Sequence, residues 1–598
     1  MKLKIRVVTM LLFIFFSAKI CFSQQLEIEK MYEFPSVNAN SYLGNVDYDA
    51  SSKTTTLLYV SKKPTKVLFN KYIFDEQLNF VENKTETYGM LDMLKDDFMS
   101  LYSWFSYKGE AYSTESILLY RNFKQEILVK KITYNYKWSW ILGGYTRSII
   151  LGEKATINAV NERVYLYDRI DNSITGDVIA ITGQRKPKGD KDKSKKFQEA
   201  RKFQFIKVRS DLSSEVVEEL SFDYNMGISF IKTITNQEMV EESTDSDGLF
   251  SEMSNKASGD FAYGDVVIVF SPVKSMLAGK AYTDPNAGNQ VMITLGADGL
   301  IKSRIDLKVP TSGWVIEDFI LSDNGEDVYF YGPAKDGAYV SSVQPVNTSL
   351  GGKTAVKDIK YKNFQLLKVT NGEMAWIQST AIGDFKGKAV NPPSQNKSPD
   401  YVGKNFSKYF AMVTPGGEVI IAGQKYTTKN VSDPNGSTPD AKMKVIDNYK
   451  HLVVFHFSVE GDLKAQYGVV RDKNNKYSKA MLTPQYAYCN SDGTALYWVY
   501  GEIKGMRKGL ELSSDILGMQ GGVSISKKKL LFYPTVAKID LANSTITDFE
   551  SFGKEGDKQV YYTNPEYPQL LSPDKKSLTF VGENKSGKVL WLGRFNIE

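Results

Sequence analysis

The chain repeats one pattern, in which a short polar turn precedes a run of apolar, β-prone residues. The clearest copy is LSPDKKSLTFVGENKSGKVLWL, residues 571–592. Ser572–Lys576 is typical of a turn, because proline fixes φ and aspartate can bond its own backbone. Ser577–Val581 and Val589–Leu592 are the two strands that the pattern predicts, on either side of a polar break.

The same pattern occurs earlier in the chain. Turns precede β-prone runs at 49–53, 108–109, 161–162, 263–265, 321–327, 414–417 and 490–493. Several of these runs are apolar at consecutive positions, as in Val266–Phe270. A strand of this kind is covered on both faces, which is what a sheet stacked between two others requires. The copies lie roughly 50 to 100 residues apart, more than the ~40–50 of compact propeller blades, so long inserted loops are predicted.

A Ser-Asp or Ser-Pro-Asp before a strand resembles the WD40-like repeat of propellers of the TolB C-terminal type. Leu571–Asp574, the strand through Phe580, and Leu590–Trp591 carry the resemblance best, and residues 321–330 and 490–498 carry it more loosely. The resemblance implies a fold and says little about activity. We therefore predict an all-β chain that forms a single β-propeller of about seven blades, within a range of six to eight.

The N-terminus has the pattern of a secretory signal. Three basic residues within the first six precede an apolar run, Val7–Phe16, and Cys21–Ser23 supplies small residues for cleavage after Ser23. The apolar run is shorter than the ~20 residues of a membrane-spanning helix. We predict a signal peptide over 1–23 and a propeller over 24–598 with no transmembrane segment. The protein is then exported, either periplasmic or on the periplasmic face of the outer membrane.

The two ends of the mature chain are predicted to meet. Leu26–Phe34 has the pattern of a strand with no candidate partner before it, and the chain ends soon after Trp591, before a fourth strand of the last blade. We predict that residues 24–34 complete the last blade and close the ring, which leaves no unpaired sheet edge there.

Composition adds little candidate chemistry. The 36 tyrosines and 32 phenylalanines favour β structure, and the net charge of +6 is small against 75 basic and 69 acidic residues. Cys489 is the only cysteine after the leader, so no intramolecular disulfide is expected. The only histidines, His451 and His456, are five positions apart on a predicted strand and so face opposite sides.

No pattern indicates catalysis. The chain has no Gly-x-Ser-x-Gly motif, and Asp245–Gly248 lacks the remaining ligands of a calcium loop. We predict that the protein is not an enzyme and has no cofactor and no metal site. Carboxylate-based glycan chemistry stays open, because it needs only two acidic side chains that are close in space, and spacing cannot nominate a pair among 69.

A basic insert is predicted over residues 185–202, between strand-like runs at 177–182 and 203–208. It contains nine basic and three acidic residues. Such a composition is typical of a solvated loop. The alternative is an electrostatic contact with an acidic protein or an anionic envelope surface, made by Arg185, Lys186, Lys188, Lys191, Lys193, Lys195 and Lys196. Nucleic acid is not an expected partner, because the protein is exported and the insert contains a single aromatic residue, Phe197.

An aromatic strand face is predicted at residues 134–140. Tyr134, Tyr136, Trp138 and Trp140 alternate with other residues, so a strand would place all four on one face. Such a face can stack sugars, but it more often packs against the neighbouring blade.

The sequence favours a protein-binding scaffold of the cell envelope, such as an accessory subunit of an outer-membrane assembly or export complex. The reasons are a rigid ring, large charged loops and the lack of recognisable chemistry. The alternative is a carbohydrate-binding or carbohydrate-active propeller that uses acidic residues. Exposed aromatic rings beside carboxylates at one mouth of the ring would favour that alternative.

Overall fold

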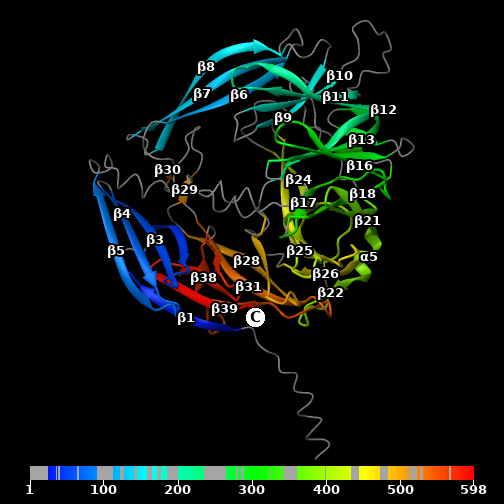
Figure 1. Cartoon of the computed structure of the whole chain (residues 1–598). Coiled ribbons are helices and arrows are strands. Elements are labelled where there is room, and N and C mark those ends of the chain that lie inside the picture. Colours follow the sequence, from blue (N-terminus) through cyan, green and yellow to red (C-terminus); the bar gives the residue numbers. More distant parts are fainter. Residues whose placement is uncertain are drawn as a thin grey trace, which may run out of the picture.

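A computed structural model of the chain describes residues 25–34, 37, 41–63, 66–89, 112–121, 127–139, 144–157, 164–171, 177–184, 200–234, 264–277, 280–283, 289–323, 325–336, 339–341, 360–397, 399–432, 443–471, 482–507, 511–513, 522–524, 529–564 and 567–598. These residues form β-sheets arranged around a central space (Figure 1). Their one helix is α5 (Ile382–Gly387). No helix in these ranges is long and apolar enough to cross a membrane.

Two separate sheets come first in the chain. The first has the strand order β2 (Ser41–Asp49), β3 (Thr54–Lys63), β4 (Lys66–Phe74) and β5 (Phe80–Gly89). The second has three strands, β6 (Tyr112–Arg121), β7 (Ile127–Ser139) and β8 (Gly144–Thr156).

A nine-stranded sheet follows. Its main path runs through β9 (Val164–Asp171), β10 (Val178–Gln184), β11 (Ala200–Val208), β12 (Ser214–Thr233), β13 (Val266–Leu277), β15 (Gln290–Leu295) and β16 (Ile301–Leu307), with β14 (Lys280–Thr283) and β19 (Tyr339–Ser341) beside it. The long strand β12 serves two groups of strands, because its first part pairs with β11 and its second part with β13.

Two further sheets occupy the middle of the chain. One contains β17 (Asp318–Leu321), β18 (Asp327–Ala334), β20 (Asn363–Thr370) and β21 (Glu373–Ala381). The other has the order β22 (Ala389–Val390), β26 (Leu463–Val469), β25 (Met443–Phe457), β24 (Val419–Ser432) and β23 (Phe406–Val413). The pairing of β22 with β26 is parallel, whereas the other pairings in these two sheets are antiparallel.

The C-terminal region forms a ten-stranded sheet that includes the first strand of the chain. Its members are β1 (Leu26–Glu33), β27 (Gln485–Cys489), β28 (Ala495–Arg507), β31 (Lys529–Asp540), β32 (Thr545–Ile546), β33 (Glu550–Ser551), β36 (Tyr561–Thr563), β37 (Gln569–Leu571), β38 (Ser577–Asn584) and β39 (Val589–Asn596). Two small ribbons accompany it, β29 (Glu511–Ser513) with β30 (Gly522–Ser524), and β34 (Lys554–Glu555) with β35 (Lys558–Gln559).

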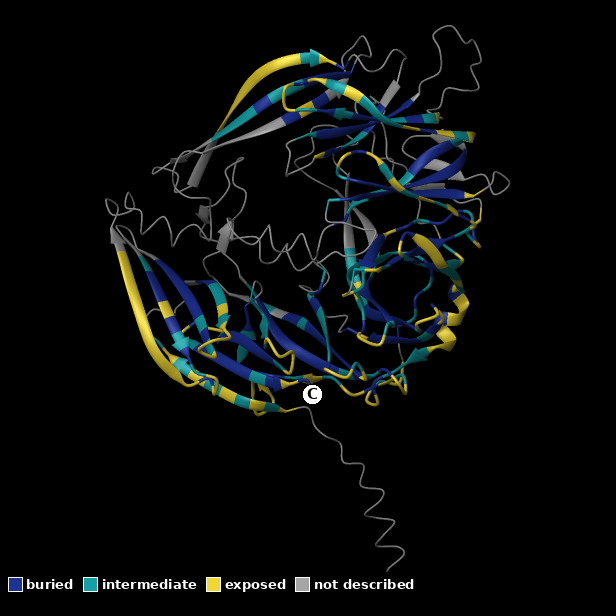
Figure 2. Cartoon of the chain, in the orientation of Figure 1, coloured by how far each residue is buried: buried dark blue, intermediate teal, exposed yellow. Residues whose placement is uncertain are grey.

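The strands with consecutive apolar residues lie in the core, as the sequence predicts. All six residues of β15 are buried, and β18 is buried from Val328 to Ala334. Strands at the outer edges instead alternate between exposed and half-buried residues, as in β1 and β16. Figure 2 shows the difference, with dark blue strands inside the sheets and yellow and teal strands around the outside. Such stacking buries both faces of the inner strands.

The repeated turns are closed by the same kind of hydrogen bond. The backbone N–H of Lys575 donates to the carbonyl of Ser572 over 2.8 Å, and the Ser572 hydroxyl donates to Asp574 over 2.6 Å. In the copy at 490–493, the N–H of Gly493 donates to the carbonyl of Asn490 over 3.1 Å. Gly493 has a φ of 71°, a conformation that glycine adopts without strain. The turn residues identified in the sequence therefore perform the same task in both copies.

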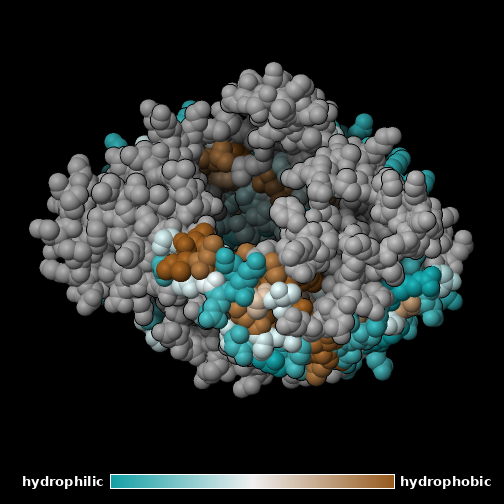
Figure 3. Space-filling view, turned by 90° about the horizontal axis from the view of Figure 1, so that it is seen from above, coloured by the Kyte–Doolittle hydropathy of each residue, from teal (hydrophilic) through white to brown (hydrophobic). Residues whose placement is uncertain are grey.

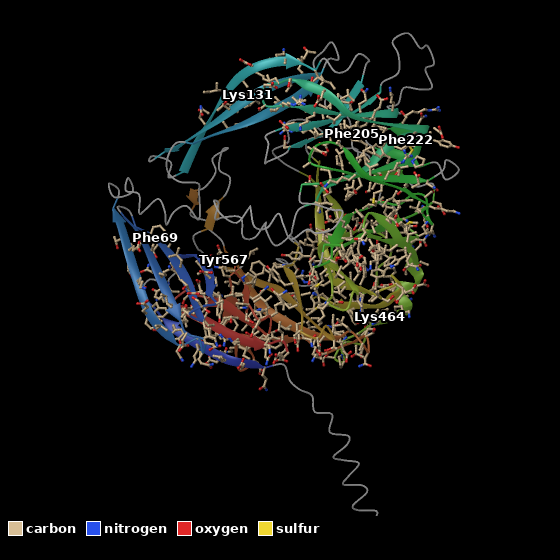
Figure 4. The ribbon with its side chains drawn as sticks, viewed as in Figure 1. Phe69, Lys131, Phe205, Phe222, Lys464 and Tyr567 are labelled. Carbon is tan, nitrogen blue, oxygen red and sulfur yellow. The ribbon has the colours of Figure 1, made fainter. Side chains whose placement is uncertain are left out.

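The first and last strands of the described chain pair with each other. β1 runs antiparallel to β39, with Met31 opposite Trp591, and the Trp591 indole N–H donates to Glu29 over 2.7 Å. The C-terminal sheet also packs against the β2–β5 sheet in one apolar cluster that includes Tyr59 and Val581. Tyr567, labelled in Figure 4, donates its hydroxyl to the carbonyl of Gly44 over 2.7 Å. The N-terminal strand is thus an integral part of the C-terminal sheet.

Candidate functional site

A cluster of charged side chains joins three consecutive groups of strands. Asp318 begins β17, and it forms ion pairs with Lys232 of β12 and Lys408 of β23. In Figure 1, β17 lies on the inner side of its sheet and β21 on the outer side. Seen from above, the molecule is hollowed at its centre (Figure 3). We call Lys232, Glu317, Asp318, Tyr331 and Lys408 the inner cluster.

The cluster arises because β17 and β23 are neighbours. β17 is the first strand of its sheet in chain order, β23 is the first long strand of its own sheet, and each lies at one end of its sheet. Just before β17, the chain continues the pairing with β18: the N–H of Glu317 donates to the carbonyl of Tyr331 over 2.9 Å. The stacking of sheets therefore brings Lys232 and Lys408, which are far apart in sequence, to the same aspartate.

The two adjacent carboxyl groups of the cluster have opposite pKa shifts. Burial would raise the pKa of Asp318, but the hydrogen bonds from Lys232 and Lys408 outweigh burial and lower it. Glu317 is accessible to solvent, yet the surrounding protein displaces much of its water and raises its pKa to about 7. Lys408 lowers the pKa of Glu317 and Asp318 raises it, both more weakly. Near neutral pH, Asp318 is therefore a fixed anion, whereas Glu317 exchanges a proton.

The hydroxyl of Tyr331 is the neutral member of the cluster. Its oxygen is buried and has no hydrogen-bond partner among the described residues. Burial, followed by the charges of Asp318 and Glu317, raises its pKa. The Lys408 ammonium lies 6.0 Å from the centre of the Tyr331 ring. A buried hydroxyl without a partner is costly, and this one lies close enough to Asp318 and Glu317 for their charges to act on it.

Two aromatic rings meet between β23 and β27. Tyr409, the residue after Lys408 on β23, meets Tyr486 of β27 with ring centroids 6.1 Å apart and the planes at 74°. Both side chains are half-buried. Tyr488, also on β27, accepts a hydrogen bond from Gln569 of β37 over 2.8 Å. Half-exposed aromatic rings are thus present on β23, which also carries Lys408, and on β27.

A second candidate surface lies on the outside, on strand β8. β8 pairs with β7 on one side, and among the described strands none pairs with its other side. Ile149, Ile150 and Leu151 have exposed fractions of 51%, 55% and 59%. We call these three residues the β8 patch. Exposed apolar side chains on an unpaired sheet edge are a known site of strand addition.

Most of the residues predicted to form sites are not described. Arg185, Lys186, Lys188, Lys191, Lys193, Lys195 and Lys196 lie outside the described residues, as do Trp140 and the loop at Asp245–Gly248. The strands that flank the basic insert, β10 and β11, pair antiparallel as a hairpin. The predicted insert extends too far at its C-terminal end, because β11 begins at Ala200 and Lys202 forms an ion pair with Glu219. Residues 200–202 therefore belong to strand β11 and not to the insert.

The predicted aromatic face is described in part. β7 places Tyr134, Tyr136 and Trp138 at alternate positions, and Tyr134 is half-buried opposite Ile149 of β8. The side chains of Tyr136 and Trp138 are outside the described part. A role in stacking a ligand or in packing between sheets stays a prediction.

The two histidines contact different groups. His456 is buried, and its imidazole lies 2.9 Å from Glu418 and 3.2 Å from the Tyr467 hydroxyl. Burial lowers the pKa of His456 despite the opposing effect of Glu418. Lys464, labelled in Figure 4, donates to the same carboxylate over 2.6 Å. His451 instead accepts a hydrogen bond from the backbone N–H of Arg471.

Neither a metal-binding group nor a reactive cysteine is evident in the described ranges. No set of three or more His, Cys, Asp or Glu residues there could hold a metal ion. Cys489 is a free thiol, half-buried beside an apolar cluster, and burial raises its pKa to about 12. A thiol with a raised pKa is a poor nucleophile at neutral pH.

Comparison with known proteins yields structural likeness only. No protein-family model matches the chain, and no curated protein matches it. Similar solved structures include the WD40 domain of Toxoplasma gondii coronin, at 8% identity and a TM-score of 0.23, which covers 82% of this chain and 87% of that one. The match to a Synechocystis apocarotenoid oxygenase mutant covers 96% of this chain and 94% of that one, at 10% identity and a TM-score of 0.23. The match to the polysaccharide lyase Uly1 covers 93% of this chain and 90% of that one, at 8% identity and a TM-score of 0.23. The described residues form an all-β fold built mostly of antiparallel sheets, and its structural neighbours include propeller folds.

These neighbours correct one prediction. The prediction that the chain is not an enzyme is contradicted by this finding, since the solved structures similar to the chain include an oxygenase and a polysaccharide lyase, which are enzymes themselves. At such low TM-scores and identities, the likeness assigns no reaction and no substrate to this chain.

Proposed function

We propose that this protein is an exported, protein-binding scaffold of the bacterial cell envelope. The proposal takes the chain as a single β-propeller of the TolB C-terminal type, with about seven blades and with residues 24–34 closing the ring. The pairing of β1 with β39 supports the closure. The groups of three or four strands in the described sheets support a count between six and eight.

The β8 patch is the observation that carries the proposal. Three consecutive exposed apolar side chains on an outer strand are unusual, because outer strands normally carry charged or polar residues that prevent edge-to-edge association. On the outer strand β5, Phe80 and Val81 are followed by the polar run Glu82–Thr87. The expected occupant of β8 is an extended segment of a partner protein. That segment would pair with the backbone of β8 and bury apolar side chains against the patch.

The leader over residues 1–23 supports the compartment, and the partner is then an envelope or outer-membrane protein. An accessory subunit of an outer-membrane assembly or export complex in the periplasm fits these features. The basic insert at Arg185–Lys196 offers a second, electrostatic contact with an acidic partner, and no nucleic-acid partner is proposed.

The test is co-purification from cells that naturally produce the protein. A tagged triple variant, Ile149→Thr, Ile150→Thr and Leu151→Thr, places β-branched, β-prone side chains at all three positions of β8 and removes the apolar contact. The matched control is Val81→Thr, since Val81 is an exposed apolar residue on the outer strand β5. We expect the wild type and the control to retain the same envelope protein at moderate salt, and the triple variant to lose it. Equal retention by the triple variant would show that the patch does not bind the partner.

A further inference from the structure

The inner cluster combines features that together suit a ligand from outside the chain. Three strands contribute to it: Lys232 from β12, Asp318 from β17 and Lys408 from β23. Glu317 is solvent-accessible beside them, and half-exposed tyrosine rings follow on β23 and β27. We propose that this inner surface binds an acidic sugar, a pyranose that carries a carboxylate group.

The polar groups of the inner cluster fit a sugar because they include both hydrogen-bond donors and acceptors. Lysine ammonium groups donate, a carboxylate accepts, and hydroxyls do both, which matches the hydroxyl groups around a pyranose. The Tyr331 hydroxyl is the independent sign of a missing partner, because it is buried without a hydrogen bond among the described residues and lies within the influence of both carboxyl groups. Tyr409 and Tyr486 supply aromatic surface for the apolar face of a sugar ring.

The charge of the cluster favours an acidic sugar over a neutral one. Two lysines face the single fixed anion Asp318, so the cluster has one net positive charge while Glu317 is protonated. When Glu317 loses its proton, the net charge falls to zero, and the new carboxylate repels that of the ligand. The groups that face Glu317 are Asp318 of β17, Lys408 of β23, Tyr331 of β18 and Tyr401.

Binding should therefore depend on pH. If the ligand requires protonated Glu317, a pKa of about 7 leaves roughly nine-tenths of the sites competent at pH 6 and roughly one-tenth at pH 8. The affinity for an acidic sugar is then about tenfold higher at pH 6 than at pH 8. A neutral sugar has no such dependence on the charge of the cluster.

The experiment is calorimetric titration of the full mature chain with a tetramer of galacturonic acid, and with cellotetraose as the neutral probe. The key variant is Glu317→Gln, which cannot ionise and keeps a donor at the same position. It should bind the acidic tetramer with the same affinity at pH 6 and pH 8. Tyr486→Leu should weaken binding at least tenfold, whereas Tyr224→Leu, on an exposed tyrosine of β12, should leave binding unchanged. Thermal melting of each variant establishes that it is folded.

Two results would overturn the proposal. One is the absence of binding of the acidic tetramer to the wild type at pH 6. The other is a pH dependence in Glu317→Gln as large as in the wild type, which would place the titrating group elsewhere. Because β8 and the inner cluster are different surfaces, substitution of the β8 patch should not change sugar binding, and each proposal can fail alone.

Discussion

The pairing of β1 with β39 gives a direct prediction about stability. In β1, alternate residues face the neighbouring sheet: Ile28 and Tyr32 are half-buried, whereas Glu27 and Glu33 are exposed. Tyr32 also packs against Phe74 of the β2–β5 sheet, with ring centroids 5.3 Å apart. The perturbation is the double variant Ile28→Ser with Tyr32→Ser, and the matched control is Glu27→Ser with Glu33→Ser.

The magnitude follows from burial. Fully burying an apolar side chain of this size stabilises a protein by about 1.5–3 kcal/mol, so a half-buried one contributes about 1 kcal/mol. Tyr32 also donates to the carbonyl of Leu78 over 2.7 Å, and such a hydrogen bond adds ~1 kcal/mol. The inward double variant should therefore lose about 3 kcal/mol in the free energy of unfolding. With an unfolding entropy of about 2.1 cal/mol/K per residue, a chain of 598 residues would melt about 2–3 °C lower.

Scanning calorimetry of the mature protein measures this shift. The outward control should melt within about 0.5 °C of the wild type, because exposed substitutions away from specific contacts usually change stability little. Deletion of residues 24–34 should lower the melting temperature further, since it also leaves the edge of β39 unpaired. An inward variant that melts together with the outward control would refute the idea that β1 anchors the C-terminal sheet.

Two further predictions concern single positions. Gly332→Ala should lower the melting temperature, because an added Cβ would lie 1.8 Å from the carbonyl oxygen of Val315, whereas Gly383→Ala in α5, with open space around it, should leave it unchanged or raise it. The raised pKa of Glu317 means that its contribution to stability is complete below its ordinary value of 4.5 and is lost as the pH rises towards 7. The melting temperature of Glu317→Gln relative to the wild type should therefore rise between pH 5 and pH 8, and a constant difference would contradict the assignment.

Local patterns in the sequence predict individual strands and turns well. The turn at Ser572–Lys576 and the two predicted strands that follow it, β38 and β39, are observed, because side-chain hydrogen bonds and β-prone residues act over a few positions. The strand at the N-terminus is also observed, as β1. The buried strand β13 follows from the consecutive apolar residues Val266–Phe270, since such a run is typical of a strand covered on both faces.

The candidate sites are not predictable in the same way. The inner cluster joins Lys232, Asp318 and Lys408, which come from three separate groups of strands, and no spacing rule relates them. Glu317 and Asp318 differ in pKa only because of what the neighbouring strands place around each. The β8 patch is hard to predict for a different reason. Ile149–Leu151 has the sequence of a core strand, and only the position of β8 at the edge of its sheet exposes it.

The most direct test of the central proposal is site-specific photo-crosslinking in intact cells that naturally produce the protein. A photoreactive amino acid would replace Ile150 of the β8 patch or, as the control, Val81 of β5, since both side chains have an exposed fraction of 55%. The account predicts that position 150 captures one envelope protein reproducibly and that position 81 does not. No crosslinked protein at position 150, or the same products at both positions, would contradict the proposal that β8 is the surface through which this scaffold binds its partner.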